Sequence, residues 1–201
     1  MRKIIYISTL LLILSCYKKT TEIRYYPTDF MFPLENYELI GLDTTKLNFQ
    51  QITNRVINDG FDSDSGNLIV EFDDGEIKKR VVPNFFGSGL YKEKNILKIK
   101  SDSILIDNNY PITELKRIFK RHYLNKGKIP YYSDSPQKTI VEVTIDTSKN
   151  GKKLKEVLTK LTRTFDEIKE EINDTIELRV FFNYFRKIPP PPPPPKIEEE
   201  Y

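Results

Sequence analysis

The chain has 201 residues, with 32 Lys and Arg against 29 Asp and Glu and a formal net charge of +3. Loss of residues 1–15, argued below, removes Arg2 and Lys3 and leaves a net charge of +1, so the composition does not indicate a nucleic-acid binder. The single cysteine excludes an intramolecular disulfide, and the length suits one domain or two small ones.

The N-terminus has the layout of a secretory signal. Arg2 and Lys3 precede an apolar run over residues 4–14, which is too short for the roughly 20 apolar residues of a membrane-spanning helix. The end of the run, Ile13-Leu14-Ser15-Cys16, resembles a bacterial lipobox. That resemblance implies cleavage before Cys16 and lipid attachment, by acyl chains such as palmitate, to its side chain. The alternative is an ordinary signal peptide with an incidental cysteine.

Five segments are predicted along the chain. Residues 1–15 are the signal peptide, 16–33 a lipid-anchored tether, 34–94 an N-terminal region, 95–186 the main domain, and 187–201 a polyproline and acidic tail. In the N-terminal region, Thr44 or Thr45 is expected to cap a short helix through Asn58. A β-hairpin should follow, because two strand-like runs, 68–72 and 76–82, flank Asp73-Asp74-Gly75.

The main domain is predicted to be α+β, a small sheet with two helices on one face in the order β-β-α-β-α-β. Its expected elements are strands at 96–99 and 104–106, a helix opened by Pro111, a strand at 139–145, a helix over 154–172 after a break at Asn150-Gly151, and a strand at 175–185. Five residues are expected at its centre: Val143, Leu158, Leu161, Phe165 and Val180.

This order resembles the periplasmic domain of the ExbD/TolR group, small partners of proton-driven motors. The residues that carry the resemblance are Ile104-Leu105-Ile106-Asp107-Asn108-Asn109-Tyr110-Pro111-Ile112 and Val141-Glu142-Val143-Thr144-Ile145-Asp146, each ahead of a helical pattern. Members of that group carry a transmembrane helix with a proton-carrying aspartate. A lipid anchor stands in its place here, so motor work is not expected.

Few side chains indicate catalysis or metal binding, and no cofactor is predicted. His122 lies on or beside the apolar stripe of its helix and is interpreted as structural. Asp62-Ser63-Asp64-Ser65-Gly66-Asn67 alternates carboxylates as a calcium loop does, but it lacks a closing Glu and is interpreted as a polar turn, so no metal is expected. Four basic residues on the helix after Pro111 could meet anionic lipid or an acidic partner, or simply face solvent: Lys116, Arg117, Lys120 and Arg121.

The C-terminal tail carries seven consecutive prolines, 189–195, followed by an acidic end. Such a run favours a polyproline II rod of roughly 22 Å at about 3.1 Å per residue. It could be a spacer, a ligand for an aromatic groove, or a non-specific extended tail. The residues predicted to contact a partner are Pro189, Pro192, Pro195, Glu198, Glu199 and Glu200.

These observations together predict a lipid-anchored bacterial envelope protein with a non-enzymatic binding or accessory role. It would face the periplasm from the inner or the outer membrane, bind a protein partner there, and bind no nucleic acid. Two alternatives stay open at this point. One is an envelope enzyme acting on glycan or lipid through unidentified carboxylates, and the other is a periplasmic immunity protein that neutralises a toxin.

Overall fold

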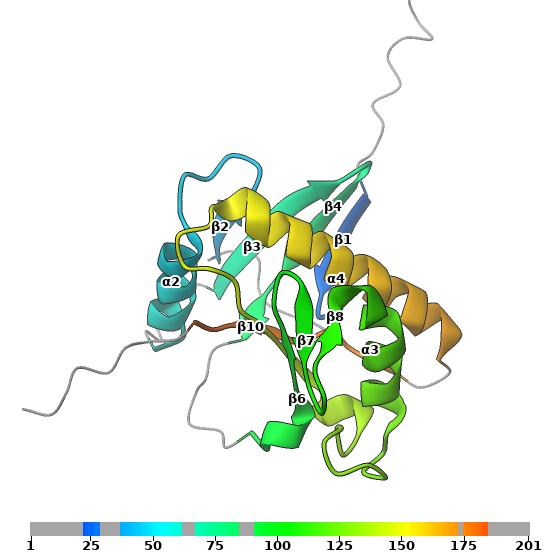
Figure 1. Cartoon of the computed structure of the whole chain (residues 1–201). Coiled ribbons are helices and arrows are strands. Elements are labelled where there is room, and N and C mark those ends of the chain that lie inside the picture. The colour runs from blue at the N-terminus through cyan, green and yellow to red at the C-terminus, as the bar shows by residue number, and fades with distance from the viewer. Residues whose placement is uncertain (1–21, 29–36, 62–66, 85–90, 173–174, 185–201) are drawn as a thin grey trace, which may run out of the picture.

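The computed structural model describes residues 22–28, 37–61, 67–84, 91–172 and 175–184. This part of the chain forms three α-helices and two mixed β-sheets, one of four strands and one of six (Figure 1). Cys16 and the tail residues from Pro189 onward lie outside the described residues. None of the helices in the described ranges is long and apolar enough to cross a membrane.

The four-stranded sheet is built around the predicted hairpin. β3 (Asn67–Asp74) pairs antiparallel with β4 (Ile77–Val81), and Gly75 takes the positive φ of 66° that this turn requires. β1 (Glu22–Tyr26) then adds parallel to β4, and β2 (Tyr37–Gly41) adds parallel to β3, which gives the order β1-β4-β3-β2. Part of the segment interpreted as a tether, residues 16–33, therefore forms an edge strand.

The six-stranded sheet has the order β5-β10-β9-β6-β7-β8. β9 (Ile140–Val143) lies at its centre between β6 (Ile96–Ile99) and β10 (Val180–Phe182), and all four residues of β9 are buried. Burial of every residue is typical of a central strand that is covered on both faces. The remaining strands are short: β5 (Pro83–Asn84), β7 (Ser103–Leu105) and β8 (Tyr110–Pro111).

Two helices begin at residues other than those the sequence predicted. α2 (Phe49–Phe61) is capped not by Thr44 or Thr45 but by Asn48, whose Oδ1 accepts from Gln51 N at 2.9 Å while Gln51 Oε1 accepts from Asn48 N at 2.9 Å. This reciprocal pair is a capping box. Asn150, expected to break the chain, instead caps α4 (Gly151–Glu171) by accepting from Lys153 N.

The tight space around residue 151 explains why α4 begins with a glycine. A Cβ at that position would lie 2.6 Å from Thr45 Cγ2, so no larger residue fits without a shift of the neighbouring loop. The third helix, α3 (Leu115–Leu124), follows a single 3-10 turn, Ile112–Glu114, so Pro111 precedes the helical segment and ends β8.

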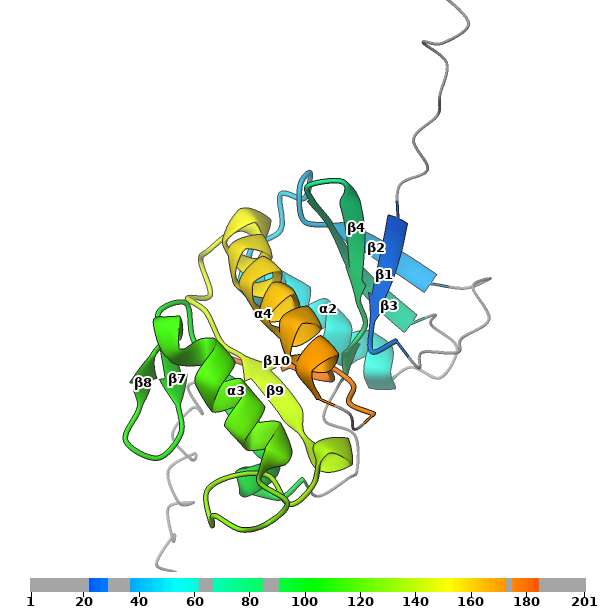
Figure 2. The same ribbon diagram turned by 90° about the vertical axis from the view of Figure 1, so that its right-hand side faces the viewer.

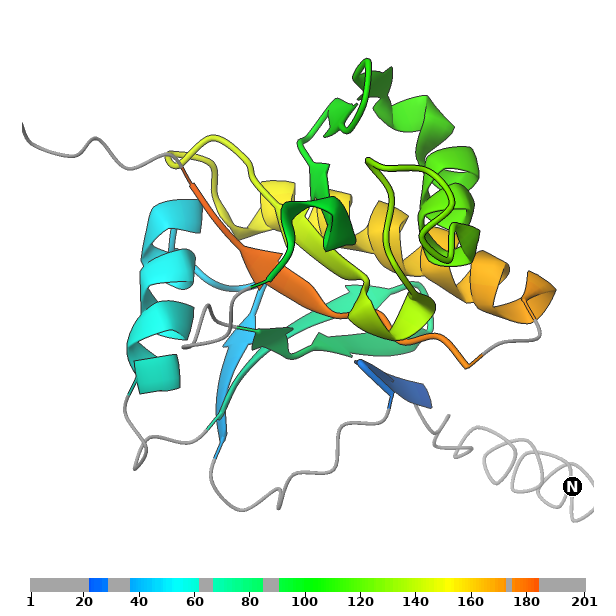
Figure 3. The ribbon, with the colours of Figure 1, turned by 90° about the horizontal axis from the view of Figure 1, so that it is seen from below.

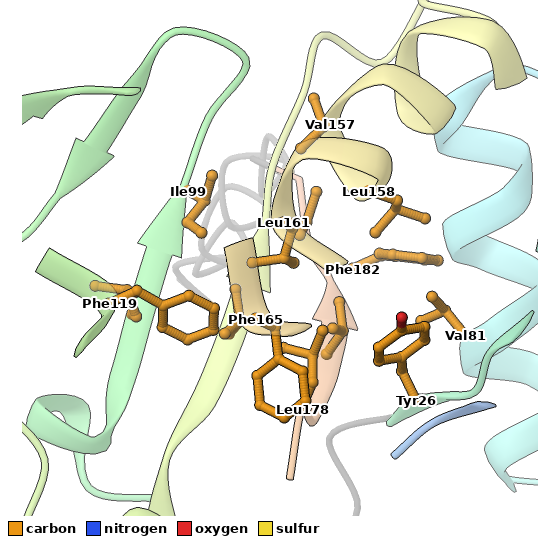
Figure 4. Close-up of a cluster of buried hydrophobic side chains, with 14 of the residues drawn as sticks. Tyr26, Val81, Ile99, Phe119, Val157, Leu158, Leu161, Phe165, Leu178 and Phe182 are labelled. Atoms are coloured by element: carbon orange, nitrogen blue, oxygen red, sulfur yellow. The ribbon is translucent and has the colours of Figure 1, made fainter. Parts of the chain in front are cut away.

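α4 is the central element of the fold. It lies between the two sheets, with α3 beside it (Figure 2). α2 lies at the end of the two sheets away from α3 (Figure 3). One continuous apolar core includes buried residues of both sheets and all three helices. Phe165 of α4 joins its parts: its ring centroid lies 6.2 Å from that of Tyr26 in β1 and 6.3 Å from that of Phe119 in α3 (Figure 4).

The structure corrects the predicted fold class in part. Helices and strands are mixed, and the five expected core residues, Val143, Leu158, Leu161, Phe165 and Val180, are all buried. The topology differs from the predicted one, however: β5 and β8 are added to the sheet of the main domain, and the hairpin belongs to a second sheet on the other side of α4. The last strand is also shorter than the predicted 175–185: Ile176 and Leu178 are buried, but pairing is confined to Val180–Phe182.

Candidate binding surface

The outer face of the four-stranded sheet presents apolar and aromatic side chains to solvent. Strand register puts Ile23 and Tyr25 of β1 on the same face as Tyr37 and Leu39 of β2, because directly paired residues share a face. Ile23 is 44% exposed and Leu39 is 38% exposed, and both tyrosines are half-buried. No helix of the described ranges covers this face, whereas α4 covers the opposite one (Figure 2). The term outer face is used below for these four residues together with Glu71, Asp73, Lys78 and Arg80, and with Ile69, which pairs with Leu39 on the same face and is fully buried.

Arg80 organises the middle of the outer face. Its guanidinium lies 5.5 Å from the ring centroid of Tyr25 and 5.9 Å from that of Tyr37, and it donates to Tyr25 Oη at 2.6 Å. Nε donates to Glu71 at 2.8 Å, and Lys78 Nζ also donates to Glu71 at 3.1 Å. Partial burial alone would raise the pKa of Glu71, but these two bonds outweigh it and lower that pKa. The carboxylate therefore stays ionised at neutral pH.

The inner face of the same sheet carries a buried ionic cluster. Lys79 is only 1% exposed, and its Nζ lies 3.0 Å from Asp74, 3.0 Å from Thr162 Oγ1 and 3.4 Å from Asp166. Thr162 and Asp166 belong to α4, so the cluster fastens the helix to the hairpin. Hydrogen bonds from Arg163 and Lys79 outweigh partial burial and lower the pKa of Asp74.

The N-terminal strand shares this cluster. Tyr26 donates to Asp166 with its Oη 2.9 Å from both carboxylate oxygens, and Arg24 lies 3.2 Å from the same carboxylate. Burial, followed by the nearby negative charge, raises the pKa of the Tyr26 phenol, so it remains a donor. Just beyond the strand, Thr28 N donates to Glu177 at 2.7 Å. β1 is thereby tied to α4 and to the segment that leads into β10.

The structure buries His122, which was interpreted from the sequence as structural. The ring is fully buried, and Nε2 lies 3.3 Å from Asn95 O, which fits an Nε2–H donor. Nδ1 has no partner among the described residues. Burial lowers the pKa of His122 to about 4, so the ring is neutral at ordinary pH. No nucleophile or orienting carboxylate of the described ranges is hydrogen-bonded to it.

The basic residues of α3 are engaged by neighbouring side chains. Lys116 pairs with Glu167 at 2.8 Å and with Glu171 at 2.9 Å, and Lys120 pairs with Glu171 at 2.6 Å. Arg117 pairs with Glu114, and Arg121 stacks over the Tyr132 ring at 4.7 Å. Most of this positive charge is therefore compensated within the domain, chiefly by α4, which weakens the idea of a free basic face.

Two hollows open on other parts of the described surface. One of about 460 Å³ runs along β6 and β7 and is lined by both charged and apolar residues, Lys98 among them. Of its two carboxylates, Glu93 is paired with Lys98 and Asp107 accepts from the Tyr110 hydroxyl. The other, about 180 Å³, lies between β6 and α4. Within the described ranges, no group of three or more His, Cys, Asp or Glu is placed to hold a metal ion.

The remaining residues predicted from sequence cannot be placed. Cys16, the six tail residues from Pro189 to Glu200, and most of the calcium-like stretch 62–67 lie outside the described residues. The outer face, conversely, was missed. The signal was present, since Ile23-Arg24-Tyr25 and Tyr37-Glu38-Leu39 both alternate with a period of two, as strands with one solvated face do.

The comparisons with known proteins return no relative. No family model, no curated protein and no solved structure matches this chain. Its function therefore has to be argued from its own residues.

Proposed function

We propose that this chain is a lipid-anchored protein of the bacterial envelope, attached through Cys16, whose domain has a non-enzymatic binding or accessory role on the periplasmic side. The observation that carries the proposal is the N-terminal pattern, a basic pair, a short apolar run and Ser15-Cys16. Several acyl chains on one cysteine give durable attachment, whereas a single chain holds only marginally.

The fold offers a mechanical reason to accept an anchor at this position. Only residues 17–21 separate Cys16 from β1, and β1 is fixed to the core by Tyr26, Arg24 and Thr28. A lipid at Cys16 would thus act on a strand that belongs to the folded domain, with almost no free chain between them.

A binding role is favoured by the character of the described polar groups. The partly buried carboxylates Asp74 and Asp166 are each held by Lys79 and by an arginine, and His122 is neutral and enclosed. These groups serve packing. The tail offers a partner contact instead: residues 189–195 would present Glu198, Glu199 and Glu200 on a stiff rod.

Metabolic labelling tests the anchor directly. Cells expressing the chain are fed radiolabelled palmitate, and the wild type should incorporate label and partition into detergent. Cys16→Ser should do neither, with Ser15→Ala as a control that keeps the thiol and a small residue before it. A wild-type chain without label would rule out the anchor.

A further inference from the structure

We propose that the outer face of the four-stranded sheet lies on the lipid surface to which the protein is anchored. This inference rests on the proposed function, because it requires a membrane close to residue 16. It assigns a ligand, the bilayer interface, to Ile23, Tyr25, Tyr37 and Leu39, which lie on one face of the sheet, two on each of its opposite edge strands.

The reach of the chain limits where the domain can sit. From Cys16 to Glu22 there are six residue steps, and an extended chain covers at most about 3.3–3.6 Å per residue. Glu22 can therefore lie no more than about 22 Å from the anchored cysteine. The 21 residues of α4 alone span about 30 Å at 1.5 Å per residue. The domain must accordingly rest close to the bilayer, with the four-stranded sheet as its nearest part.

Two sides of that sheet are candidates for the contact. The first is the strand-end tip where the chain enters, since Glu22 pairs in register with Ile77 beside the β3–β4 turn. The exposed residues of that turn are Asp73, Gly75 and Glu76, none of which is apolar, and Asp74 is enclosed by Lys79 and Arg163, so the tip offers the bilayer little apolar contact. The second is the outer face, where Ile23 and Leu39 are exposed and two tyrosines flank them. Tyrosine is enriched at membrane interfaces because its ring is apolar and its hydroxyl is polar.

The charges of the outer face suit this role. Lys78 and Arg80 are balanced by Glu71 and Asp73, so the face is close to neutral. Arg80 lies between the two tyrosine rings and is held there by Glu71 and the Tyr25 hydroxyl. Attraction should come from apolar contact more than from net charge, so added salt should change it little.

Site-specific fluorescence tests the orientation. Cys16 is the only natural cysteine and carries the lipid, so an introduced cysteine is the only free thiol. Ile23→Cys and Leu39→Cys report on the outer face. Leu124→Cys and Tyr131→Cys, at residues 39% and 63% exposed on the side of the domain that carries α3, are the matched controls. Each variant is labelled with an environment-sensitive dye and reconstituted into vesicles of phosphatidylethanolamine and phosphatidylglycerol.

We expect the dyes at 23 and 39 to shift to shorter emission wavelengths and to be quenched several-fold less by aqueous iodide than those at 124 and 131. Equal quenching at all four sites would overturn the inference. So would protection of 23 and 39 that appears only after envelope proteins are added, because the face would then bind protein.

A second means of attachment makes the test of the outer face independent of the test of the lipid anchor. The chain from residue 17, which retains every described element, is held by an N-terminal hexahistidine to nickel-chelating lipid. Protection at 23 and 39 there would support the face even if palmitate labelling failed, and its loss would refute the face even if labelling succeeded. An Ile23→Ser, Leu39→Ser double variant carrying the dye at a third outer-face position, Tyr37→Cys, should lose protection while keeping the wild-type melting temperature.

Discussion

Lys78, Lys79 and Arg80 follow one another in β4, yet their surroundings differ sharply. Lys79 is enclosed between the sheet and α4 and touches two carboxylates, whereas Lys78 and Arg80 lie on the outer face and share Glu71. The strand pleat alone separates them. Packing of α4, a helix far along the chain, therefore decides which of three adjacent cations is enclosed and which lie on the outer face.

The largest effect on stability is expected at α4, the helix that covers the inner face of the four-stranded sheet. Leu161 of α4 is fully buried (Figure 4), and Leu161→Ala should cost about 2–5 kcal/mol through lost transfer energy and a cavity. Urea denaturation measures it. Leu124→Ala, at an exposed position of α3, is the control and should lie within about 0.5 kcal/mol of the wild type. An unchanged midpoint for Leu161→Ala would contradict the packing around α4.

The two lysines give the most direct comparison of the faces. Lys79→Met keeps the aliphatic stem but leaves Asp74 and Asp166 short of a cation inside the protein. We expect a loss of about 3 kcal/mol, the lower end for a broken buried pair, because Arg163 and Arg24 still reach the two carboxylates. Lys78→Met breaks a surface pair and should cost about 1 kcal/mol or less. Equal losses would show that the faces do not differ as described.

A third test uses the pH dependence of stability. The pKa of buried His122 is lowered to about 4 in the folded protein, against about 6.5 when unfolded, so the unfolded state binds the additional proton between these values. Stability should be unaffected above about pH 6.5 and should fall by up to about 3 kcal/mol as the pH drops to about 4. His122→Gln should flatten that slope in urea titrations. A slope identical to that of the wild type would mean that His122 is not buried as a neutral ring.

The smallest effect is expected at the C-terminus. Prolines 189–195 cannot donate to a sheet, so deleting residues 189–201 should leave the melting temperature unchanged while weakening capture of a partner from solubilised envelopes. Replacing Glu198, Glu199 and Glu200 by Gln keeps the rod and should make any capture less sensitive to salt. A clear drop in melting temperature on deletion would show that the tail packs on the domain.

Local patterns predicted the local parts of this fold. The hairpin at Asp73-Asp74-Gly75 and the amphipathic run of α4 depend on neighbours in sequence, and both are present. The two-sheet arrangement depends on pairings across long stretches, such as β1 with β4 and β5 with β10, which periodicity does not encode. Segment 22–26 was consequently interpreted as part of a tether.

The sequence does contain an indication of the ionic cluster on the inner face, although it was not used for a prediction. Lys79 shares its parity with Ile77 and Val81, so a charged residue stands in the apolar row of a strand. That row predicts a buried cation in need of a partner. Its partners Thr162 and Asp166 lie more than eighty positions later on a helix, and only the tertiary structure brings them together.

The parallel pairing of β1 also determines how the domain responds to a pulling force. A force on residue 22 acts along the axis of β1. When the domain is held elsewhere, the five residue pairs between β1 and β4 are therefore loaded together in shear and do not separate one after another. Arg24 and Tyr26 pass part of that load to α4 through Asp166, and Thr28 passes part to Glu177. Resistance to such a force is a matter of unfolding rate more than of equilibrium stability. β1 would thus transmit a force at the proposed anchor directly to α4, the central helix.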